Sequence, residues 1–342
     1  MRILHIANHI ERIGNGIVNV AIDLACMQAK YGHEIAIASA GGEYEELLEE
    51  YNVKHFYLNQ GRQPINLIQA ISEYRKIIYD FQPDIVHAHM MTGVVLAATL
   101  RFGCNYSLVS TVHNEFQRSA ILMGLADRVI AVSNAVSKAM SSRGIPQQKI
   151  RVVANGTLGS PRLPRVEEYQ PVTLQRPAIT TVAGMYRRKG IGELIDAFIK
   201  IAPSFPAAHL YLVGDGPDRG IFEQKVKNIN LTDTKQTCRE ESPKAYANRI
   251  HFTGFQANPQ SYMLSSDIFV LASWKESFGL VLTEAREAGC AIVASDVDGI
   301  PETLDNRQAG ILFPIKDSDA LADVLFKLLK DDQELQNWKE KA

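Results

Sequence analysis

The sequence predicts an α/β protein with two doubly wound parallel sheets. Short, β-branched apolar runs alternate with helical patterns through most of the chain, as in a sheet whose strands are joined by helices. The alternation stops in a proline-rich stretch at 158–177 and then resumes. The length of 342 residues also exceeds what one hydrophobic core usually organises. We therefore expect an N-terminal domain over residues 1–160, a C-terminal domain over 161–342, and a cleft between them.

The expected strands of the first half are apolar on both faces, which is typical of strands buried inside a parallel sheet. They are residues 2–7, 34–39, 84–88, 107–112, 128–133 and 150–154. Ile17, Val20, Ala21 and Leu24 recur at helical spacing, which predicts an amphipathic helix over 16–30.

In the second half, two helices are expected at 190–201 and 279–289. The expected strands are 178–183, 208–213, 249–253, 267–271 and 290–294. The polar residues 230–248 predict a loop insertion without an assigned function.

Composition narrows the class of protein. Hydrophobic residues make up 46% and charged residues 22%, as in ordinary globular proteins, and a net charge of −2 gives no support for nucleic acid as a partner. The chain has no C-x-x-C pair, so no structural zinc site is expected. Cys26, Cys104 and Cys290 lie in apolar runs and predict buried thiols in a reducing setting. The start lacks a signal-peptide pattern, and no apolar run approaches 18 residues, so we expect a cytoplasmic protein.

The densest chemical signal lies in residues 267–302. A strand ends near Leu271, Glu276 follows in a loop, and a helix begins near Gly279 and contains Glu284. The first N–H groups of a helix have no partner within it, and the helix dipole attracts an anion there. A glycine also lets a phosphate approach the backbone. The pattern predicts a nucleotide sugar bound across this helix end.

A basic turn follows the strand at 178–183. Arg188 and Lys189 place two cations there, and a departing nucleotide diphosphate needs such charge. The alternative is a solvated basic turn.

In the first half, a short glycine turn at 14–16 separates a strand from its helix, and His113 ends another strand. A tight strand–helix connection and a structural loop histidine are the alternatives for these two features.

These motifs together resemble the retaining GT-B glycosyltransferases of family 4. The segment from Glu276 to Glu284 has the form E-x7-E, G-I-P-E follows at 299–302, and the similarity spans nearly the whole chain. The resemblance implies the GT-B fold, with two Rossmann-like domains facing a central cleft. It implies that Glu276 approaches the hydroxyls of the donor sugar and that Glu284 binds the ribose. The backbone amides of Phe278, Gly279 and Leu280 would hold the diphosphate.

The resemblance implies further roles. Lys189 and Gly190 match the family's basic turn, whose usual arginine is replaced by Met185, so that Arg188 or Arg187 would substitute for it. The other implied positions are Asn15 and Gly16 beside the donor phosphates and acceptor, His113 beside the donor sugar, Asn155 at the domain junction, Gly214 near the nucleoside, and Phe255 within the segment from Arg249 that holds the base.

Two patterns in the sequence are candidates for metal binding. His87 and His89 end a strand, but two histidines with no nearby cysteine or carboxylate do not make a metal site, so we expect a structural or acceptor-side role. Asp296 and Asp298 form a D-x-D pattern, which in the other large glycosyltransferase fold binds a divalent cation. Here Asp298 leads into G-I-P-E, so neither a metal nor another cofactor is expected.

The expected function is retaining transfer of a hexose from a nucleotide sugar, by default a UDP-sugar. The acceptor would be a polysaccharide, an oligosaccharide or a lipid-linked glycan. Because no nucleophile is evident, we expect a front-face mechanism in which the departing phosphate oxygen takes the acceptor proton. An epimerase or hydrolase of the same fold is the alternative. A periplasmic type of sugar-binding protein would need a signal peptide and would lack the basic turn.

Two expectations concern the wider setting of the enzyme. Residues 101–165 hold nine Lys and Arg against two acids, a net charge of +7, which predicts peripheral contact with an anionic membrane on the cytoplasmic side. The apolar stretch Ala120–Ala126 would insert shallowly or form a core helix, and the charges could instead scatter over several faces. Family members end in a helix that crosses back onto the N-terminal domain, so we also expect residues after Ala342.

Overall fold

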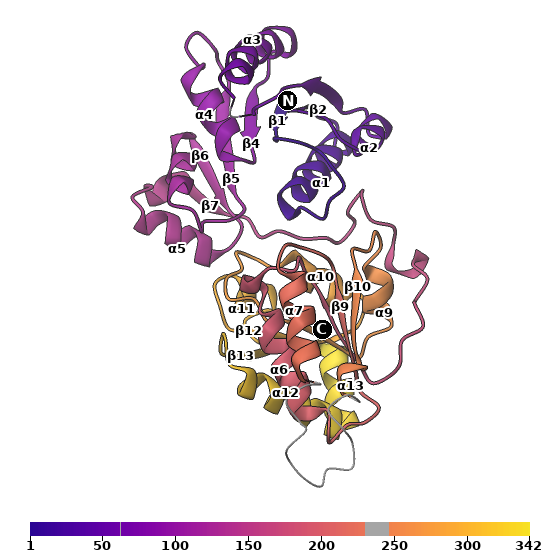
Figure 1. The fold of residues 1–342 in the computed structure, drawn as a ribbon. Helices are drawn as coiled ribbons and strands as arrows, with labels where there is room; N and C mark the ends of the chain where they lie inside the picture. Colours follow the sequence, from indigo (N-terminus) through magenta and orange to yellow (C-terminus); the bar gives the residue numbers. More distant parts are fainter. Residues whose placement is uncertain (62, 230–245) are drawn as a thin grey trace. The chain divides into compact units, whose positions relative to one another are not determined.

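The computed structural model describes residues 1–61, 63–229 and 246–342. They form two compact units (Figure 1). Unit 1 comprises residues 1–155 and 159–164, and unit 2 comprises 156–158 and the described residues from 165 to 342. Most of the expected loop at 230–248 lies outside the described residues.

Unit 1 contains a seven-stranded parallel sheet in the order β3-β2-β1-β4-β5-β6-β7. The strands are β1 (Arg2–Ile6), β2 (Glu34–Ser39), β3 (Lys54–Tyr57), β4 (Ile85–Ala88), β5 (Ser107–Val112), β6 (Arg128–Ala131) and β7 (Ile150–Val152). The main helices are α1 (Gly16–Lys30), α2 (Glu45–Glu50), α3 (Pro64–Phe81), α4 (Met91–Thr99) and α5 (Asn134–Ser142), with 3₁₀ helices η1 (Arg118–Leu125) and η2 (Gln147–Lys149). The expected parallel sheet is confirmed.

Unit 2 contains a six-stranded parallel sheet in the order β10-β9-β8-β11-β12-β13. The strands are β8 (Ala178–Val182), β9 (His209–Val213), β10 (Ile250–Gly254), β11 (Ile268–Leu271), β12 (Ala291–Ser295) and β13 (Ile311–Phe313). The helices are α6 (Ile191–Ile201), α7 (Arg219–Ile229), α9 (Gln260–Leu264), α10 (Leu280–Glu287), α11 (Ile300–Thr303), α12 (Ser318–Lys330) and α13 (Asp332–Lys341), with 3₁₀ helices η3 (Val166–Glu168) and η4 (Arg187–Lys189).

Strand alternation explains how the second sheet buries both of its faces. Along β11, Ile268 and Val270 pack with α6, α7 and α12, whereas Phe269 and Leu271 pack with α9, α10 and α11. All four side chains are buried. A strand covered on both faces has no polar side, so it is a continuous apolar run in the sequence.

Two strands were missed by the sequence prediction. Strand β3 is KHFY, of which no residue is fully buried, and β13 has only three residues. Both strands lie at an edge of their sheet, where one flank is not paired. Cys104 is only half-buried, so the expectation that it is buried was wrong, while Cys26 and Cys290 are buried as predicted. Among the described residues, no helix is long and apolar enough to cross a membrane.

Candidate functional site

The central feature of unit 2 is an ion pair between the basic turn and the loop after β11. Nζ of Lys189 lies 2.5 Å from Oε2 of Glu276, and each side chain is 17% exposed. The two loops are also joined through their backbones, because the N–H of Trp274 donates to the carbonyl of Arg188 at 2.8 Å. The structure therefore brings together two residues that lie 87 positions apart in the sequence.

Close packing holds the basic turn in place. Gly190 has a φ of +68° and caps α6, and a Cβ built on it would lie 1.9 Å from the carbonyl oxygen of Ala272. A side chain cannot fit there, so the turn can approach the β11 loop only with glycine at this position. Arg188 is exposed, and its guanidinium lies 5.4 Å from the centre of the Tyr186 ring. Met185 is fully buried in the core of unit 2, which leaves its position without a cation.

Helix α10 begins beside Glu276. Gly279 is its N-cap with a φ of +92°, and a Cβ on Gly279 would lie 3.4 Å from Cγ of Glu276. The carbonyl of Phe278 accepts a hydrogen bond from Thr303 at 2.6 Å, which holds the turn before the helix. The first N–H groups of α10, including that of Leu280, have no partner inside the helix by helix geometry. This end of α10 therefore offers donors next to the Lys189–Glu276 pair.

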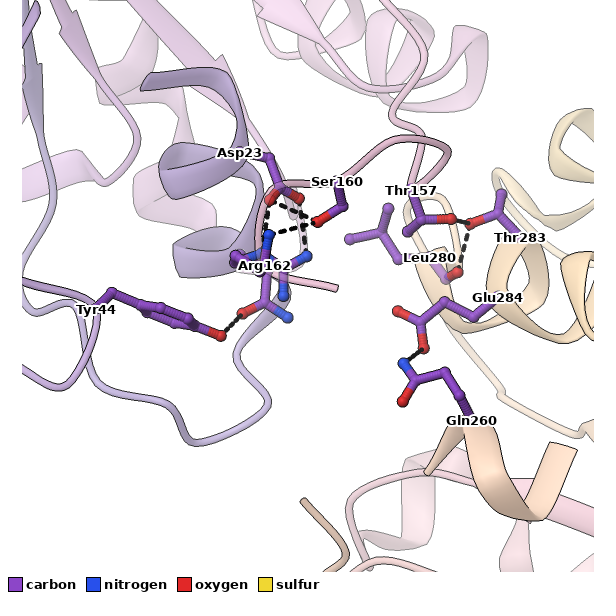
Figure 2. Close-up of polar contacts among 10 residues, drawn as sticks. Asp23, Tyr44, Thr157, Ser160, Arg162, Gln260, Leu280, Thr283 and Glu284 are labelled. Atoms are coloured by element: carbon purple, nitrogen blue, oxygen red, sulfur yellow. Dashed lines mark hydrogen bonds and ion pairs between the residues drawn. The ribbon is translucent and has the colours of Figure 1, made fainter. Parts of the chain in front are cut away.

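Glu284 lies further along α10, where Oε2 accepts a hydrogen bond from Nε2 of Gln260 on α9 at 3.1 Å (Figure 2). Gln260 is buried, and the sequence prediction did not include it. The two residues lie 24 positions apart on different helices, so no local sequence pattern predicts their contact. The Glu284 carboxylate, held by Gln260, can accept hydrogen bonds from ribose hydroxyls.

The two aspartates of the D-x-D pattern have separate partners. Asp296 pairs with Arg307 at 2.5 Å, and Asp298 accepts a hydrogen bond from the backbone N–H of Glu276 at 3.1 Å. Asp298, which the sequence prediction did not assign to the donor site, therefore positions the loop that carries Glu276. The carbonyl of Glu276 in turn accepts from the N–H of Gly299 at 3.0 Å.

The positions expected near the nucleoside lie at the ends of β9 and β10. Gly214 and Gly254 form a bridge, with the N–H of Gly214 donating to Gly254 at 2.8 Å. Phe255 follows directly and is 57% exposed, so its ring is available to stack on a base. Arg249 directly precedes β10, is buried, and donates to the carbonyls of Phe205 and Ala202. These contacts of Arg249 are structural, and base binding by the segment that ends at Phe255 stays a prediction.

Unit 1 contains a cluster of buried histidines. His5 and His87 are register partners on β1 and β4, and His89 follows β4. One nitrogen from each of these three rings lies within 4.8 Å of the others. His113 adjoins the cluster, since its Nε2 lies 3.2 Å from Nδ1 of His89. The sequence prediction missed His5, which looked like one more position of an apolar strand.

Burial keeps these imidazoles neutral. It lowers the pKa of His113 to about 4 and the pKa of His5 to about 4, the latter against the opposing effect of a hydrogen bond to Gln28. Burial also lowers the pKa of His87 and the pKa of His89 well below their ordinary value. A neutral imidazole accepts a hydrogen bond at one nitrogen and donates from the other.

The glycine turn of unit 1 has a helix-capping role. Gly16 is the first residue of α1, and the side chain of Asn15 accepts a hydrogen bond from the N–H of Ile17 at 3.0 Å. Asn15 therefore caps the helix. This contact agrees with the alternative of a tight strand–helix connection, and it leaves a second role at the donor phosphates as a proposal.

The segment after β7 contacts each unit in turn (Figure 2). Asn155 is the last residue of the first part of unit 1. Oγ1 of Thr157 then lies 2.8 Å from Oγ1 of Thr283 on α10, within unit 2. The chain returns to unit 1, where Arg162 donates two hydrogen bonds of 2.9 and 2.8 Å to Asp23 on α1. The connection is thus anchored to the first helix of one unit and to the candidate phosphate-binding helix of the other.

Family models match both halves of the chain. A model described as Glycosyltransferase Family 4 matches residues 14–157, and one described as Glycosyl transferases group 1 matches residues 176–331. The N-acetyl-alpha-D-glucosaminyl L-malate synthase of Bacillus anthracis is 26% identical over 96% of this chain and 88% of its own length. The phosphatidyl-myo-inositol mannosyltransferase of Mycolicibacterium smegmatis is 34% identical, but the match covers 43% of this chain and 34% of that enzyme.

Solved structures share the fold. HepE of Anabaena, in a crystal structure with UDP and glucose, has a TM-score of 0.79 and 20% identity, and the match covers 100% of this chain and 93% of that one. The lipopolysaccharide outer core galactosyltransferase WaaB has a TM-score of 0.71 and 17% identity over 99% of this chain and 95% of its own. At these identities, the likeness is one of fold.

Proposed function

We propose that this chain, which belongs to the group 1 or family 4 glycosyltransferases, transfers a hexose from a UDP-sugar to a glycan or lipid-linked acceptor. Members of this family are retaining enzymes of the GT-B fold that use nucleotide sugars. The observation that carries the proposal is the Lys189–Glu276 pair at the start of α10. It places a cation, a carboxylate and helix N–H donors at one point, which suits a sugar diphosphate.

In this proposal, the N–H groups of Phe278, Gly279 and Leu280 bind the diphosphate, and Lys189 and Arg188 neutralise the charge that develops on it. Glu276 accepts hydrogen bonds from the hexose hydroxyls, and its contact with Lys189 orients it. The bond between the sugar's anomeric carbon and the phosphate oxygen breaks, while the acceptor hydroxyl oxygen bonds to that carbon on the same face. The departing phosphate oxygen takes the hydroxyl proton, so no protein nucleophile is needed.

The nucleoside would lie further along unit 2. Glu284, oriented by Gln260, accepts hydrogen bonds from the ribose hydroxyls. The exposed ring of Phe255 stacks on the base beside the Gly214 bridge. In unit 1, Asn15, Gly16, Asn155 and His113 are proposed to contact the donor sugar or the acceptor. The Anabaena HepE structures hold UDP, which is the reason to prefer a uridine donor.

Acceptor-dependent release of UDP tests the reaction. The purified protein is first screened with a panel of nucleotide sugars for a rise in melting temperature, because a ligand that binds only the folded state stabilises it. UDP release from the best donor is then measured with and without candidate glycan acceptors. Release that needs an acceptor supports transfer, while release in water alone indicates a hydrolase. Conversion of the donor to another nucleotide sugar indicates an epimerase.

The Glu276→Ala variant tests the site. We expect transfer to be lost while the far-UV circular dichroism spectrum and UDP binding persist. A Glu287→Ala variant is a matched control, because Glu287 is an exposed carboxylate on α10, the helix that follows Glu276. Comparable turnover in the Glu276→Ala protein would remove this residue from the active site.

We further propose that unit 1 contacts an anionic membrane, where a lipid-linked acceptor would lie. Three of the nine basic residues are at least partly buried. Arg101 pairs with Asp127, Lys149 donates to the carbonyls of Gly124 and Ala126, and Arg162 is buried. The exposed residues of this set within unit 1 are Arg118, Arg128, Lys138, Arg143 and Arg151.

The 3₁₀ helix η1 adds an apolar element to this region. Leu122 and Leu125 of η1 are exposed, while Ala120 and Met123 are buried. Arg143 lies close by, since its guanidinium donates to the carbonyl of Gln117, next to Arg118. Exposed leucines beside basic side chains are typical of a surface that binds the membrane interface.

A further inference from the structure

Three histidines and one glutamine form a continuous hydrogen-bonded row in unit 1. Oε1 of Gln28 on α1 lies 2.8 Å from Nε2 of His5, and Nδ1 of His5 lies 3.0 Å from Nε2 of His89. Nδ1 of His89 lies 3.2 Å from Nε2 of His113. The His5 and His89 rings are stacked at an interplanar angle of 25°, and the His89 and His113 rings at 26°. Both ring nitrogens of His5 and of His89 are therefore engaged.

The chemistry of neutral imidazole makes this row directional. Each ring has one N–H donor and one bare nitrogen, so a ring that donates at one nitrogen must accept at the other. The carbonyl oxygen of Gln28 can only accept, and it therefore receives the proton of His5 Nε2. Nδ1 of His5 is then bare and accepts from His89, whose own Nδ1 is bare and accepts from His113. Each tautomer in the row follows from the one before it.

We propose that Gln28, His5 and His89 are positioning residues that set the tautomer of His113. The proton of His113 is held on Nε2, and its Nδ1 is a hydrogen-bond acceptor. Among the described residues, none forms a hydrogen bond with Nδ1 of His113. The role of His113 rests on the proposed function, in which the row directs Nδ1 of this residue to accept a hydrogen bond from a sugar or acceptor hydroxyl.

The burial of the histidines is consistent with the row. His5 and His89 are almost completely buried, and burial lowers the pKa of each ring, which favours the neutral form that a directional row requires. His87 stands outside the row, because its Nε2 lies 2.7 Å from Oγ1 of Thr111. A metal ion held by His5, His87 and His89 would have to displace these hydrogen bonds, so it is the competing explanation that the experiment must separate.

Nitrogen-15 spectroscopy of the full chain reads the tautomers directly. Long-range proton–nitrogen correlation spectra of protein with labelled histidine distinguish a protonated ring nitrogen from a bare one, and a His113→Asn variant identifies the His113 signals. At pH 8, we expect His5, His89 and His113 all to carry the proton on Nε2. A proton on Nδ1 of His113 in the unaltered protein would overturn the proposal, as would stoichiometric metal in the purified protein by elemental analysis.

Variants of Gln28 then test its control of the row. Glutamate can only accept a hydrogen bond and lysine can only donate one, so Gln28→Glu and Gln28→Lys form a matched pair at a half-buried position. We expect Gln28→Glu to keep the proton of His113 on Nε2 and Gln28→Lys to move it to Nδ1. Equal spectra for the two variants would contradict the proposal. A Gln28→Lys protein that did not fold would leave the spectrum of the unaltered protein as the deciding measurement.

Kinetics add a readout that a purely structural role would not produce. Gln28→Glu should retain kcat within about threefold, and Gln28→Lys should lower kcat by about tenfold or more with little change in the donor KM, because one hydrogen bond in the transition state is altered. Equal losses in both variants would indicate a packing effect and count against the proposal. The tautomer spectra need no substrate, so they stand even if the proposed transferase activity fails.

Discussion

Nζ of Lys189 and Oε2 of Glu276 lie 2.5 Å apart, and they join the basic turn after β8 to the loop before α10. Charge-assisted contacts of this kind are short and orient both partners. The pair gives Lys189 two roles in the proposed site, since the same ammonium group orients a carboxylate and would neutralise charge on the diphosphate.

Removing Lys189 should cost far more activity than removing an exposed lysine. Lys189→Ala is expected to lower kcat by about 10²-fold or more, the typical loss for one preorganised electrostatic contact. Steady-state transfer rates check this. Lys200→Ala is the control, because Lys200 also forms a short ion pair, with Asp319, but the side chains of both residues are exposed. Similar rates in the two variants would exclude Lys189 from the transition state.

Transfer should proceed without a divalent metal. Asp296 and Asp298 are engaged by Arg307 and by the backbone of Glu276, and Lys189 and Arg188 can supply the charge that a metal would provide. Turnover measured in excess EDTA should equal turnover in buffer alone. Complete loss that Mn²⁺ or Mg²⁺ restores would revive the D-x-D interpretation.

Glu284 should act mainly on nucleotide affinity. A hydrogen bond to a charged group contributes about 1.5–3 kcal/mol, so Glu284→Ala should weaken UDP binding by about 10- to 100-fold and raise the donor KM. Gln260→Ala should have a smaller effect in the same direction, because Gln260 only orients the carboxylate. Isothermal titration with UDP gives both affinities. Unchanged affinity in Glu284→Ala would mean that the ribose lies elsewhere.

The histidines of the row should make stability depend on pH. Because burial lowers the pKa of His5 and of His113 to about 4, the unfolded chain binds more protons than the folded one as the pH falls below 6.5. Their contribution is fully present above pH 6.5 and is lost as the pH falls towards 4. Urea unfolding should show a loss of roughly 2 kcal/mol per such histidine between pH 7 and 5.

Asp267 does not act in that window. Although desolvation raises the pKa of this buried carboxyl, hydrogen bonds from Arg176, the backbone of Ala178 and Lys339 lower its pKa overall, so its contribution is lost only at lower pH. A His5→Asn variant should have a flatter pH profile than the unaltered protein. His251→Gln, at a half-buried histidine of unit 2, should change the profile less. An unfolding free energy that stays constant from pH 7 to 5 would contradict the expectation.

Membrane contact should depend on exposed charge in unit 1. We expect binding to anionic vesicles in flotation experiments, with a decline at high salt. The Arg118→Ala, Arg143→Ala double variant should bind about tenfold or more weakly. Lys327→Ala with Lys330→Ala on α12 removes the same charge from exposed sites of unit 2 and serves as the control. No binding at low salt would indicate a soluble acceptor or delivery by another protein.

The sequence by itself determined the fold class, because strands buried on both faces are continuous apolar runs. It did not determine the buried face of α1: of the four residues expected to form that face, only Ala21 is buried, and the other buried residues are Val18, Ile22, Ala25 and Cys26. It also placed Glu276, Gly279 and Glu284 on one loop and helix, since positions within a few residues of each other are linked by local geometry. Only the tertiary structure decided which distant residues meet. The pairing of Lys189 with Glu276, the contact of Gln260 with Glu284, and the row from Gln28 to His113 all depend on how strands and helices pack. A local pattern contains no record of such packing, and a buried histidine such as His5 looks in sequence like any other position of its strand.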